Sequence, residues 1–485
     1  MIQHDEVAID ALHDAVAQRV NDGFGVICMY AVEPGDSLRS LQVIMRKGGD
    51  VVRLSSDLDG RSYPSLALSM PGLRFYEREI SEMSGITSVG LPAFGPQRIM
   101  WRYNGAYPLQ KEELPKERIF VPMLGNGIQG EGVFEIPVGP VHAGVIEPGH
   151  FRFSVAGEPI LKVKAHLGFT YRGVERLLET SADKDNTRLV ERISGDTAVA
   201  NSLAYAHAIE GDREVPYRAK LMRVIFAELE RIQCHFNDIS GIAQDTAFVV
   251  PSALGAGIRE KVLRLNEEIG GHRYLMGVII PGGVRKDISD INIEAIDKRV
   301  LKMRFDLEEL KDMLYSSTTF MDRAETTGKL SHDDALVIRA VGPVARASGV
   351  ISDIRKDRPY DAYGMLGMKV ISSDKCDVLS RLKVRIEEIT ESASMINQCL
   401  NHMEDGPLFE KVSLKEGFSL GIVEAPRGEL MHALHVVNGK VWRHKIRDPS
   451  FINWNALERA LPGNIVPDFP LINKSFNLSY SGNDL

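Results

Sequence analysis

Residues 191–205, Glu-Arg-Ile-Ser-Gly-Asp-Thr-Ala-Val-Ala-Asn-Ser-Leu-Ala-Tyr, open a largely helical part of the chain. The pattern predicts a helix start with Ser194 as the N-cap and Asp196 as the competing candidate. Either side chain can accept a hydrogen bond from a free backbone amide at a helix start. A catalytic serine is the less favoured interpretation, since the sequence indicates no Ser/His/Asp arrangement.

Four long segments after this stretch carry apolar residues at helical spacing, and we expect them to pack as a bundle. They are residues 217–237, 258–269, 291–314 and 378–402. The chain then predicts three strands, at residues 418–424, 432–437 and 441–446. The pair Asn438-Gly439 between the last two is typical of a tight hairpin turn. Residues 149–156 alternate like a strand.

The first ~100 residues predict a small α/β unit. Val7, Leu12, Val16 and Val20 fit one helix face, residues 25–30 and 41–45 favour strands, and residues 74–83 favour a second helix. A segment rich in proline and glycine follows. We therefore predict an α+β protein in three parts: an α/β domain at 1–103, a connector at 104–135 and a mainly helical domain with peripheral β structure at 136–485.

Composition excludes several classes of protein. The formal net charge of −8 argues against nucleic-acid binding, which usually needs a basic patch. No apolar run reaches the ~18–20 residues that cross a bilayer, and the charged N-terminus lacks the apolar core of a signal peptide. We expect a cytoplasmic protein that meets a membrane only through partners. Four widely spaced cysteines predict reduced, mostly buried thiols rather than a zinc or iron–sulfur site.

Three further stretches are polar or end the chain. The turn at 136–144 contains His142, which as a lone loop histidine is more often structural than functional. Residues 346–360 mix dense charges with Gly, Pro and Tyr, and the favoured interpretation is a solvated surface loop. The apolar residues at 468–485 indicate that the C-terminal segment docks onto the protein.

Taken together and in order, these stretches resemble one family. Residues 75–92, FYEREISEMSGITSVGLP, resemble the NuoC-like subunit of complex I. Residues from about 136 onward resemble the NuoD-like subunit and its relative, the large subunit of membrane-bound nickel-iron hydrogenases. The two are fused here as in the formate hydrogenlyase large subunit. The order and spacing of five or six motifs make this resemblance specific.

The resemblance also locates the metal-ligand positions. Hydrogenases of this family carry E-R-V-C-G-x-C-x-x-A-H-S-x-A-Y and, near the C-terminus, D-P-C-x-x-C. In the same frames this chain has Ser194 and Thr197, then Ser479 and Gly482. A nickel-iron pair needs soft, anionic thiolates, which hydroxyls do not replace. We expect no nickel-iron centre. The chain also ends three residues after the last ligand position, as expected of a protein that never receives the metals.

Quinone binding is a second possibility that the resemblance raises. The quinone tyrosine of complex I aligns with Gly195, and the second histidine of its motif aligns with Ile146. Only the first histidine has a counterpart, His142. An unusual quinone mode that uses His142 or His150 stays open.

Four polar residues are therefore candidates for lining the former cavity: Glu191, Asp196, Arg355 and His142. A carboxylate buried beside an arginine can act as a proton station. Equally, paired charges can simply fill the space left by the metals.

The resemblance implies partners of three kinds: a NuoB-like iron–sulfur subunit, a NuoI-like ferredoxin-type subunit and membrane antiporter-like subunits. This chain itself is expected to bind no cofactor. The leading hypothesis is a subunit of an ion-translocating redox complex. The alternatives are an enzyme that reduces a quinone or another small acceptor, and a non-catalytic structural transducer.

Overall fold

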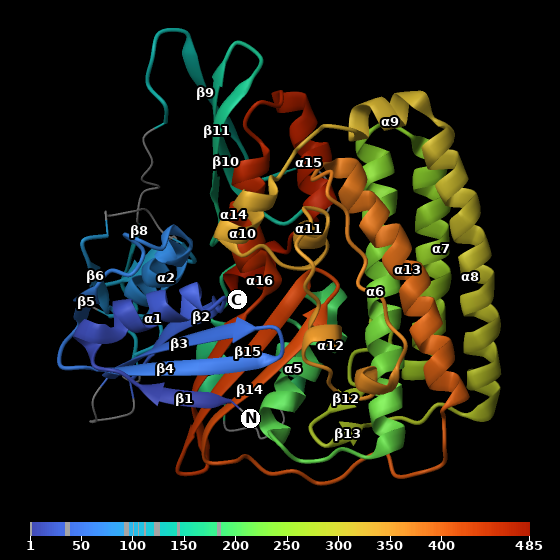
Figure 1. The fold of residues 1–485 in the computed structure, drawn as a ribbon, viewed down its shortest axis with the longest axis horizontal. Helices are drawn as coiled ribbons and strands as arrows, with labels where there is room; N and C mark the ends of the chain where they lie inside the picture. Colours follow the sequence, from blue (N-terminus) through green and yellow to red (C-terminus); the bar gives the residue numbers. More distant parts are fainter. Residues whose placement is uncertain are drawn as a thin grey trace.

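The computed structural model describes residues 2–33, 39–91, 97–99, 101–104, 106–110, 113–120, 127–142, 146–181 and 186–485. It is a mixed α+β protein, as predicted, with a sheet-containing unit at one side and a helical bundle at the other (Figure 1). A further three-stranded sheet lies between them. The proposed domain boundaries stay predictions.

The N-terminal unit is built on a four-stranded sheet with the order β1-β4-β3-β2. Its elements are β1 (Gln3–Glu6), α1 (Leu12–Asn21), β2 (Gly25–Val32), β3 (Arg39–Lys47), β4 (Asp50–Leu58) and α2 (Arg74–Ser84). The expected helix and strands are confirmed, but Val7 lies outside the helix. It follows β1, and its amide bonds to Ser55 in continuation of the β1–β4 pairing.

Further strands follow β4 along the chain. They are β5 (Ser62–Pro64), β6 (Thr87–Val89), β7 (Trp101–Tyr103), β8 (Arg118–Phe120), β9 (Val133–Val138), β10 (His150–Ala156) and β11 (Ile160–His166). The strand expected at 149–156 is confirmed as β10, the central strand of the sheet β11-β10-β9. In Figure 1 this sheet rises beside the C-terminal helices.

The bundle consists of α6 (Tyr217–Asp245), α7 (Val249–Gly270), α8 (Asp290–Ser316) and α13 (Val378–Asn401), as the apolar spacing predicts. Helix α6 packs against both α7 and α13 and is buried along most of its length. Its polar residues therefore lie inside the protein, where each needs a partner. This helix positions the candidate site.

The central sheet has the order β14-β15-β16, from β14 (Gly417–Ala425), β15 (Gly428–Val437) and β16 (Lys440–Arg447). Asn438 and Gly439 both have positive φ, which confirms the predicted tight turn. One face packs on α5 (Ala198–Glu210). Gly421 allows the close approach, because a Cβ there would lie 1.9 Å from the Ala204 carbonyl oxygen.

The sheet also joins the N-terminal unit to the rest of the protein. Ile422, Met431 and Phe451 belong to the same apolar cluster as the strands of that unit. The Tyr30 hydroxyl lies 2.8 Å from His435 Nε2 across this boundary.

The remaining elements are short. They are α3 (Val174–Thr180), α4 (Thr187–Val190), α9 (Thr318–Ala324), α10 (His332–Ile338), α11 (Gly342–Arg346), α12 (Ile354–Asp357), α14 (Pro449–Ala460), α15 (Phe469–Phe476), α16 (Tyr480–Asp484), β12 (Ile279–Ile280) and β13 (Gly283–Val284). Docking of the C-terminal segment is confirmed: Asp484 accepts hydrogen bonds from the Gly168 and Thr170 amides. In the described part of the chain, no helix is long and apolar enough to cross a membrane.

Candidate functional site: a serine cluster beside a buried charge network

The two stretches that contain the four expected metal-ligand positions meet in the structure. Ser194, before α5, and Ser479, before α16, are both buried, and their Oγ atoms lie 2.9 Å apart. Ser479 Oγ also accepts a hydrogen bond from the Gly482 amide at 2.9 Å and lies 3.3 Å from Ser481 Oγ. We call Ser194, Ser479 and Ser481 the serine cluster. The folded chain thus brings together positions almost 300 residues apart, as the resemblance implies.

The start of α5 differs from the predicted capping. Thr197, not Ser194, is the N-cap, and its side chain makes no capping bond. The carboxylate of Glu230 on α6 instead accepts the amides of Val199 at 2.6 Å and Ala200 at 3.0 Å. A carboxylate from a neighbouring helix satisfies the free amides better than a local hydroxyl, because it offers two oxygens at the positive helix end.

Asp196 forms the strongest ion pair next to the serine cluster. Arg427, in the turn between β14 and β15, donates to both carboxylate oxygens, at 2.6 and 3.1 Å. Ser194 Oγ donates to the same carboxylate at 2.9 Å. Burial raises the pKa of Asp196, but Arg427 and Ser194 outweigh it and lower this pKa to about 2. Asp196 is therefore ionised at neutral pH.

The space around Gly482 bears on whether a nickel-iron pair could be held at these four positions. A Cβ at this position would lie 2.8 Å from the Asp448 carboxylate, closer than a side chain tolerates. That carboxylate is held by its own role, since it caps α14 through the Ser450 amide at 2.8 Å. The four positions thus offer three hydroxyls and no fourth side chain. The residues present do not fit a nickel-iron pair.

The other two candidates near this region have structural partners. Glu191 is buried, and its carboxylate accepts the Gly277 amide at 2.6 Å. His142 Nε2 lies 2.8 Å from the Gly149 carbonyl oxygen. Gly149 in turn faces the ring of Tyr480. Gly149 therefore lies between His142 and the C-terminal segment. The motif around His142 continues into residues 143–144, which lie outside the described residues.

The expectation of a solvated loop at 346–360 is wrong. Arg346, Asp353 and Arg355 are almost completely buried. Arg355 donates to Asp353 at 2.7 Å and to Glu228 of α6 at 3.0 Å. The dense charges are there because they neutralise one another inside the protein, which a sequence pattern alone does not distinguish from a solvated loop.

These residues belong to a larger buried cluster, which we call the charge network. It consists of Glu228, Arg231, Arg346, Asp353, Arg355, Glu388 and Glu424. Arg346 is its centre, with Glu424 at 2.7 Å and Glu388 at 2.7 Å. Ser392 and Tyr363 donate further hydrogen bonds to Glu228.

The charge network contains three guanidinium groups and four carboxylates. Burial and the neighbouring Asp353 raise the pKa of Glu424, whereas the arginines lower the pKa of Asp353 and Glu228 after offsetting their burial. One extra carboxylate in a dry interior is expensive unless it takes a proton. Glu424 is thus the group best placed to hold one.

His235 connects the charge network with the serine cluster. Its Nε2 lies 2.8 Å from Glu388, and its Nδ1 lies 4.0 Å from Asp238. Asp238 pairs with Arg385 at 2.7 Å and accepts a bond from Asn477, whose carbonyl oxygen binds Arg427. Contacts therefore link Asp196 to Glu424 through Arg427, the backbone and side chain of Asn477, Asp238, His235, Glu388 and Arg346, but the step at His235 Nδ1 is a 4.0 Å approach and not a hydrogen bond.

The structure brings Asp196 and Ser194 together but places Arg355 in the separate charge network. Sequence reasoning missed Arg427, Glu424 and the polar residues of α6. One signal existed for the helix: Glu228, Arg231, His235 and Asp238 recur at intervals of three and four within an otherwise apolar segment. Such a stripe marks one helix face that needs buried partners.

Comparison with known proteins gives the class of protein to which this fold belongs. Two family models match. The 30 Kd subunit of the respiratory-chain NADH dehydrogenase matches residues 4–118, and the 49 Kd subunit matches residues 245–416 and 408–484.

Curated relatives agree with these matches. Formate hydrogenlyase subunit 5 of Escherichia coli is 33% identical over 89% of this chain and 79% of its own length. Hydrogenase-4 component G of the same organism is 34% identical over 90% and 78%. An NADH-quinone oxidoreductase subunit of Geobacter sulfurreducens is 29% identical over 69% of this chain and 94% of its own length. The chain belongs to the hydrogenase-related complex I family and is a NuoC/NuoD-type fusion.

Proposed function

We propose that this chain is the large subunit of a membrane-associated, complex I-like oxidoreductase and couples electron transfer in iron–sulfur partners to ion translocation without a nickel-iron centre of its own. One observation carries this proposal. The chain aligns with formate hydrogenlyase subunit 5 over 89% of its length, yet Gly482 abuts Asp448 and the other three ligand positions are hydroxyls. The alignment supports membership of a redox complex. The lack of thiolates at the four positions argues against a nickel-iron centre.

The charge network supports a role in moving protons. It holds one carboxylate in excess, and Glu424 is the group whose pKa is raised. A change of charge on a neighbouring cluster would shift such a proton, because charges act over long distances in a dry interior. The network joins α6, α13 and β14 with α11 and the start of α12.

Partners follow from the relatives, several of which are named as subunits or components of larger assemblies. We propose a NuoB-like iron–sulfur subunit, a NuoI-like ferredoxin-type subunit and antiporter-like membrane subunits as the partners. Iron–sulfur clusters belong to those partners, and the membrane association comes through them.

The coupling is tested with Glu424→Gln in the native complex. Glutamine keeps an oxygen for Arg346 but holds no titratable proton. We expect the complex to assemble and its iron–sulfur clusters to be reduced by the native donor, while redox-driven ion uptake into vesicles falls at least about tenfold. The matched control is the exposed residue Glu410, as Glu410→Gln.

Two outcomes would count against the proposal. Unchanged ion uptake in Glu424→Gln would show that the charge network takes no part in coupling. It would favour the alternative of a non-catalytic structural transducer. Isolation of the chain from membranes without iron–sulfur partners would contradict membership of a redox complex.

A further inference from the structure

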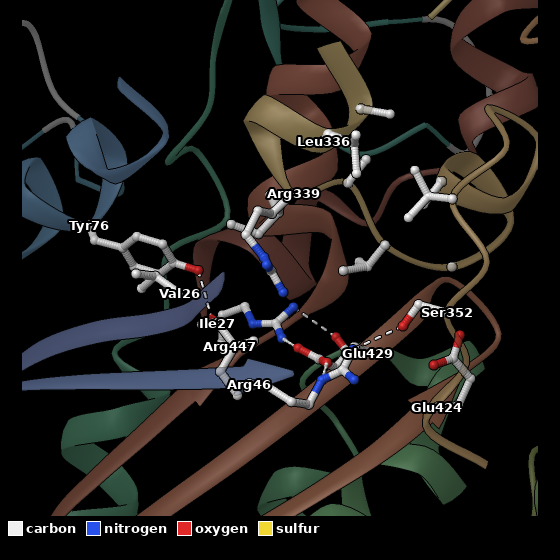
Figure 2. Close-up of a pocket in the computed structure, with 17 residues that line it drawn as sticks. Val26, Ile27, Arg46, Tyr76, Leu336, Arg339, Ser352, Glu424, Glu429 and Arg447 are labelled. Atoms are coloured by element: carbon white, nitrogen blue, oxygen red, sulfur yellow. Dashed lines mark hydrogen bonds and ion pairs between the residues drawn. The ribbon is translucent and has the colours of Figure 1, made fainter. Parts of the chain in front are cut away.

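A cavity of about 110 Å³ lies where the N-terminal unit meets the body of the protein. Its walls come from β2, β3 and α2 on one side and from residues around α10, β14, β15 and β16 on the other. Figure 2 shows three arginine side chains, Arg46, Arg339 and Arg447, converging on it together with Glu429. A volume of this size holds several water molecules or a small polar group.

Two of these arginines are tied to the protein. Arg46 donates to Glu429 at 2.7 Å and to Ser352 Oγ at 3.0 Å. Arg447 pairs with the same Glu429 and donates to its backbone carbonyl at 2.9 Å. Arg447 Nε is nevertheless buried without a hydrogen-bond partner among the described residues. Arg46 also pairs with Asp357 at 3.2 Å, so the two guanidinium groups share Glu429 and one donor, Arg447 Nε, is left over.

Arg339 has no such partner. Within the described residues, its guanidinium makes no hydrogen bond or ion pair, although it lies in the cavity and points toward Arg447 and Glu429 (Figure 2). Burial lowers the pKa of Arg339, and Glu429 offsets this only in part. An isolated, partly desolvated cation is unfavourable unless an anion joins it.

The backbone holds Arg339 in this position. Arg339 has a φ of 60° at the end of α10, a left-handed conformation that arginine seldom adopts. The guanidinium lies directly on Gly25, where a Cβ would come within 1.2 Å of its NH1 atom. A side chain at position 25 would therefore displace the guanidinium from its present place.

An apolar cleft of about 280 Å³ adjoins this cavity. The two share Val26, Tyr76, Leu336, Arg339 and Ile452 in their walls. The cleft adds mainly apolar residues, among them Val20, Phe24, Met70 and Val337. Its mouth is open to solvent, since Val337 is 57% exposed and Leu336 is 50% exposed. Arg339 thus stands at the border between an apolar cleft and a cationic cavity.

We infer that this paired site binds an amphiphilic carboxylate, with its oxyanion at Arg339 and Arg447 Nε and its apolar chain in the adjoining cleft. Charge complementarity selects the head group. Of the guanidinium groups at the cavity, Arg46 pairs with Glu429 and Asp357 and Arg447 pairs with Glu429, whereas Arg339 has no counter-charge within the described residues. Glu424 also lines the cavity, but it is paired with Arg346. A carboxylate accepts the planar fork of an arginine in a bidentate manner. Apolar walls with a few convergent polar groups are typical of small-molecule sites.

The test is calorimetric titration of the full-length protein with three probes: octanoate, octan-1-ol and inorganic phosphate. We expect octanoate to bind saturably with one site per chain. Both other probes should bind at least about tenfold more weakly, because octan-1-ol lacks the carboxylate and phosphate lacks the apolar chain. Octanoate should also raise the melting temperature, because it binds the folded state.

Variants locate the site. Arg339→Asn removes the guanidinium but suits the left-handed backbone, so it should fold at least as well as the original chain. We expect its octanoate affinity to fall at least about tenfold. Gly25→Ala, which displaces the arginine without removing its charge, should have the same effect. Arg304→Asn, an exposed position on α8, is the control and should bind normally.

The inference is overturned if octanoate shows no saturable binding to the original chain. It is equally overturned if octan-1-ol or phosphate binds as tightly as octanoate, or if Arg339→Asn binds octanoate with unchanged affinity. The comparison of the three probes needs no variant, so it decides the matter even where a substitution destabilises the protein.

Discussion

At the scale of single residues, the positions that the resemblance assigns to metal ligands are joined by hydrogen bonds. Ser194 and Ser479 bond to each other, and Ser479 also caps α16 through the Gly482 amide. Asp196 adds a carboxylate that Arg427 neutralises. Hard oxygen atoms in mutual contact satisfy one another. The thiol of Cys234 lies beside them, but it is a single sulfur ligand and donates to the Asp196 carbonyl oxygen at 3.2 Å.

Gly482→Cys should be more destabilising than Ser479→Cys. The new Cβ would meet the Asp448 carboxylate at 2.8 Å, so either the cap of α14 breaks or α16 shifts. We expect a loss of about 1–3 kcal/mol in the free energy of unfolding for Gly482→Cys. Ser479→Cys, nearly isosteric, should lose less. Denaturant unfolding of both variants measures this, and equal stability of the two would show that position 482 has room for a side chain.

The Asp196–Arg427 pair should make the free energy of unfolding depend on pH in the acidic range. The pKa of Asp196 is about 2 in the folded protein, below its value of 3.8 in the unfolded chain. The pair therefore stabilises the protein above about pH 4, and this contribution of about 2 kcal/mol is lost as the pH falls toward 2.

Asp196→Asn should remove this contribution at neutral pH and flatten the pH profile between about 4 and 2. Thermal unfolding across that range measures both effects. If the variant and the original chain lose stability in parallel through this range, the ion pair does not stabilise the fold.

At the scale of elements, α6 determines where the charges lie. Its apolar spacing predicted a bundle helix correctly, and the structure shows a polar stripe that faces α13, β14 and residues 353–363. Arg355 and Glu228 are 127 residues apart, so their pairing depends on how the helices pack. For this reason, a sequence pattern predicts a helix or strand more easily than it predicts the residues that the helix or strand contacts.

Glu228→Gln should destabilise the protein strongly. The carboxylate pairs with Arg355 and Arg231 and accepts bonds from Ser392 and Tyr363. Glutamine removes the carboxylate that Arg231 and Arg355 contact directly and turns one of its acceptors into a donor that faces them, and we expect a loss of about 3–5 kcal/mol. Chemical denaturation is the measurement.

Glu260→Gln on α7 is the matched control, since that residue pairs with Arg264 and Arg273 at the surface. A solvated pair contributes little, so this variant should change stability by less than about 0.5 kcal/mol. If the two variants are equally stable, Glu228 is not essential to the charge network.

At the scale of the whole molecule, the sequence predicted the composition of the fold better than the contacts between its parts. The turn at Asn438-Gly439 and the four bundle helices follow from local patterns. The burial of residues 346–360 does not, because an arginine that pairs inside the protein has the same local pattern as one that faces water. Likewise, the place of Arg339 in its cavity depends on how the N-terminal unit packs on the central sheet.

We infer that this chain keeps the architecture of a hydrogenase-related large subunit but not its metals. Elemental analysis of the intact, natively purified complex is the measurement that decides this. We expect nickel far below one atom per large subunit, together with iron and sulfide attributable to the partner subunits. Nickel at one atom per large subunit would show that the chain binds the metals after all.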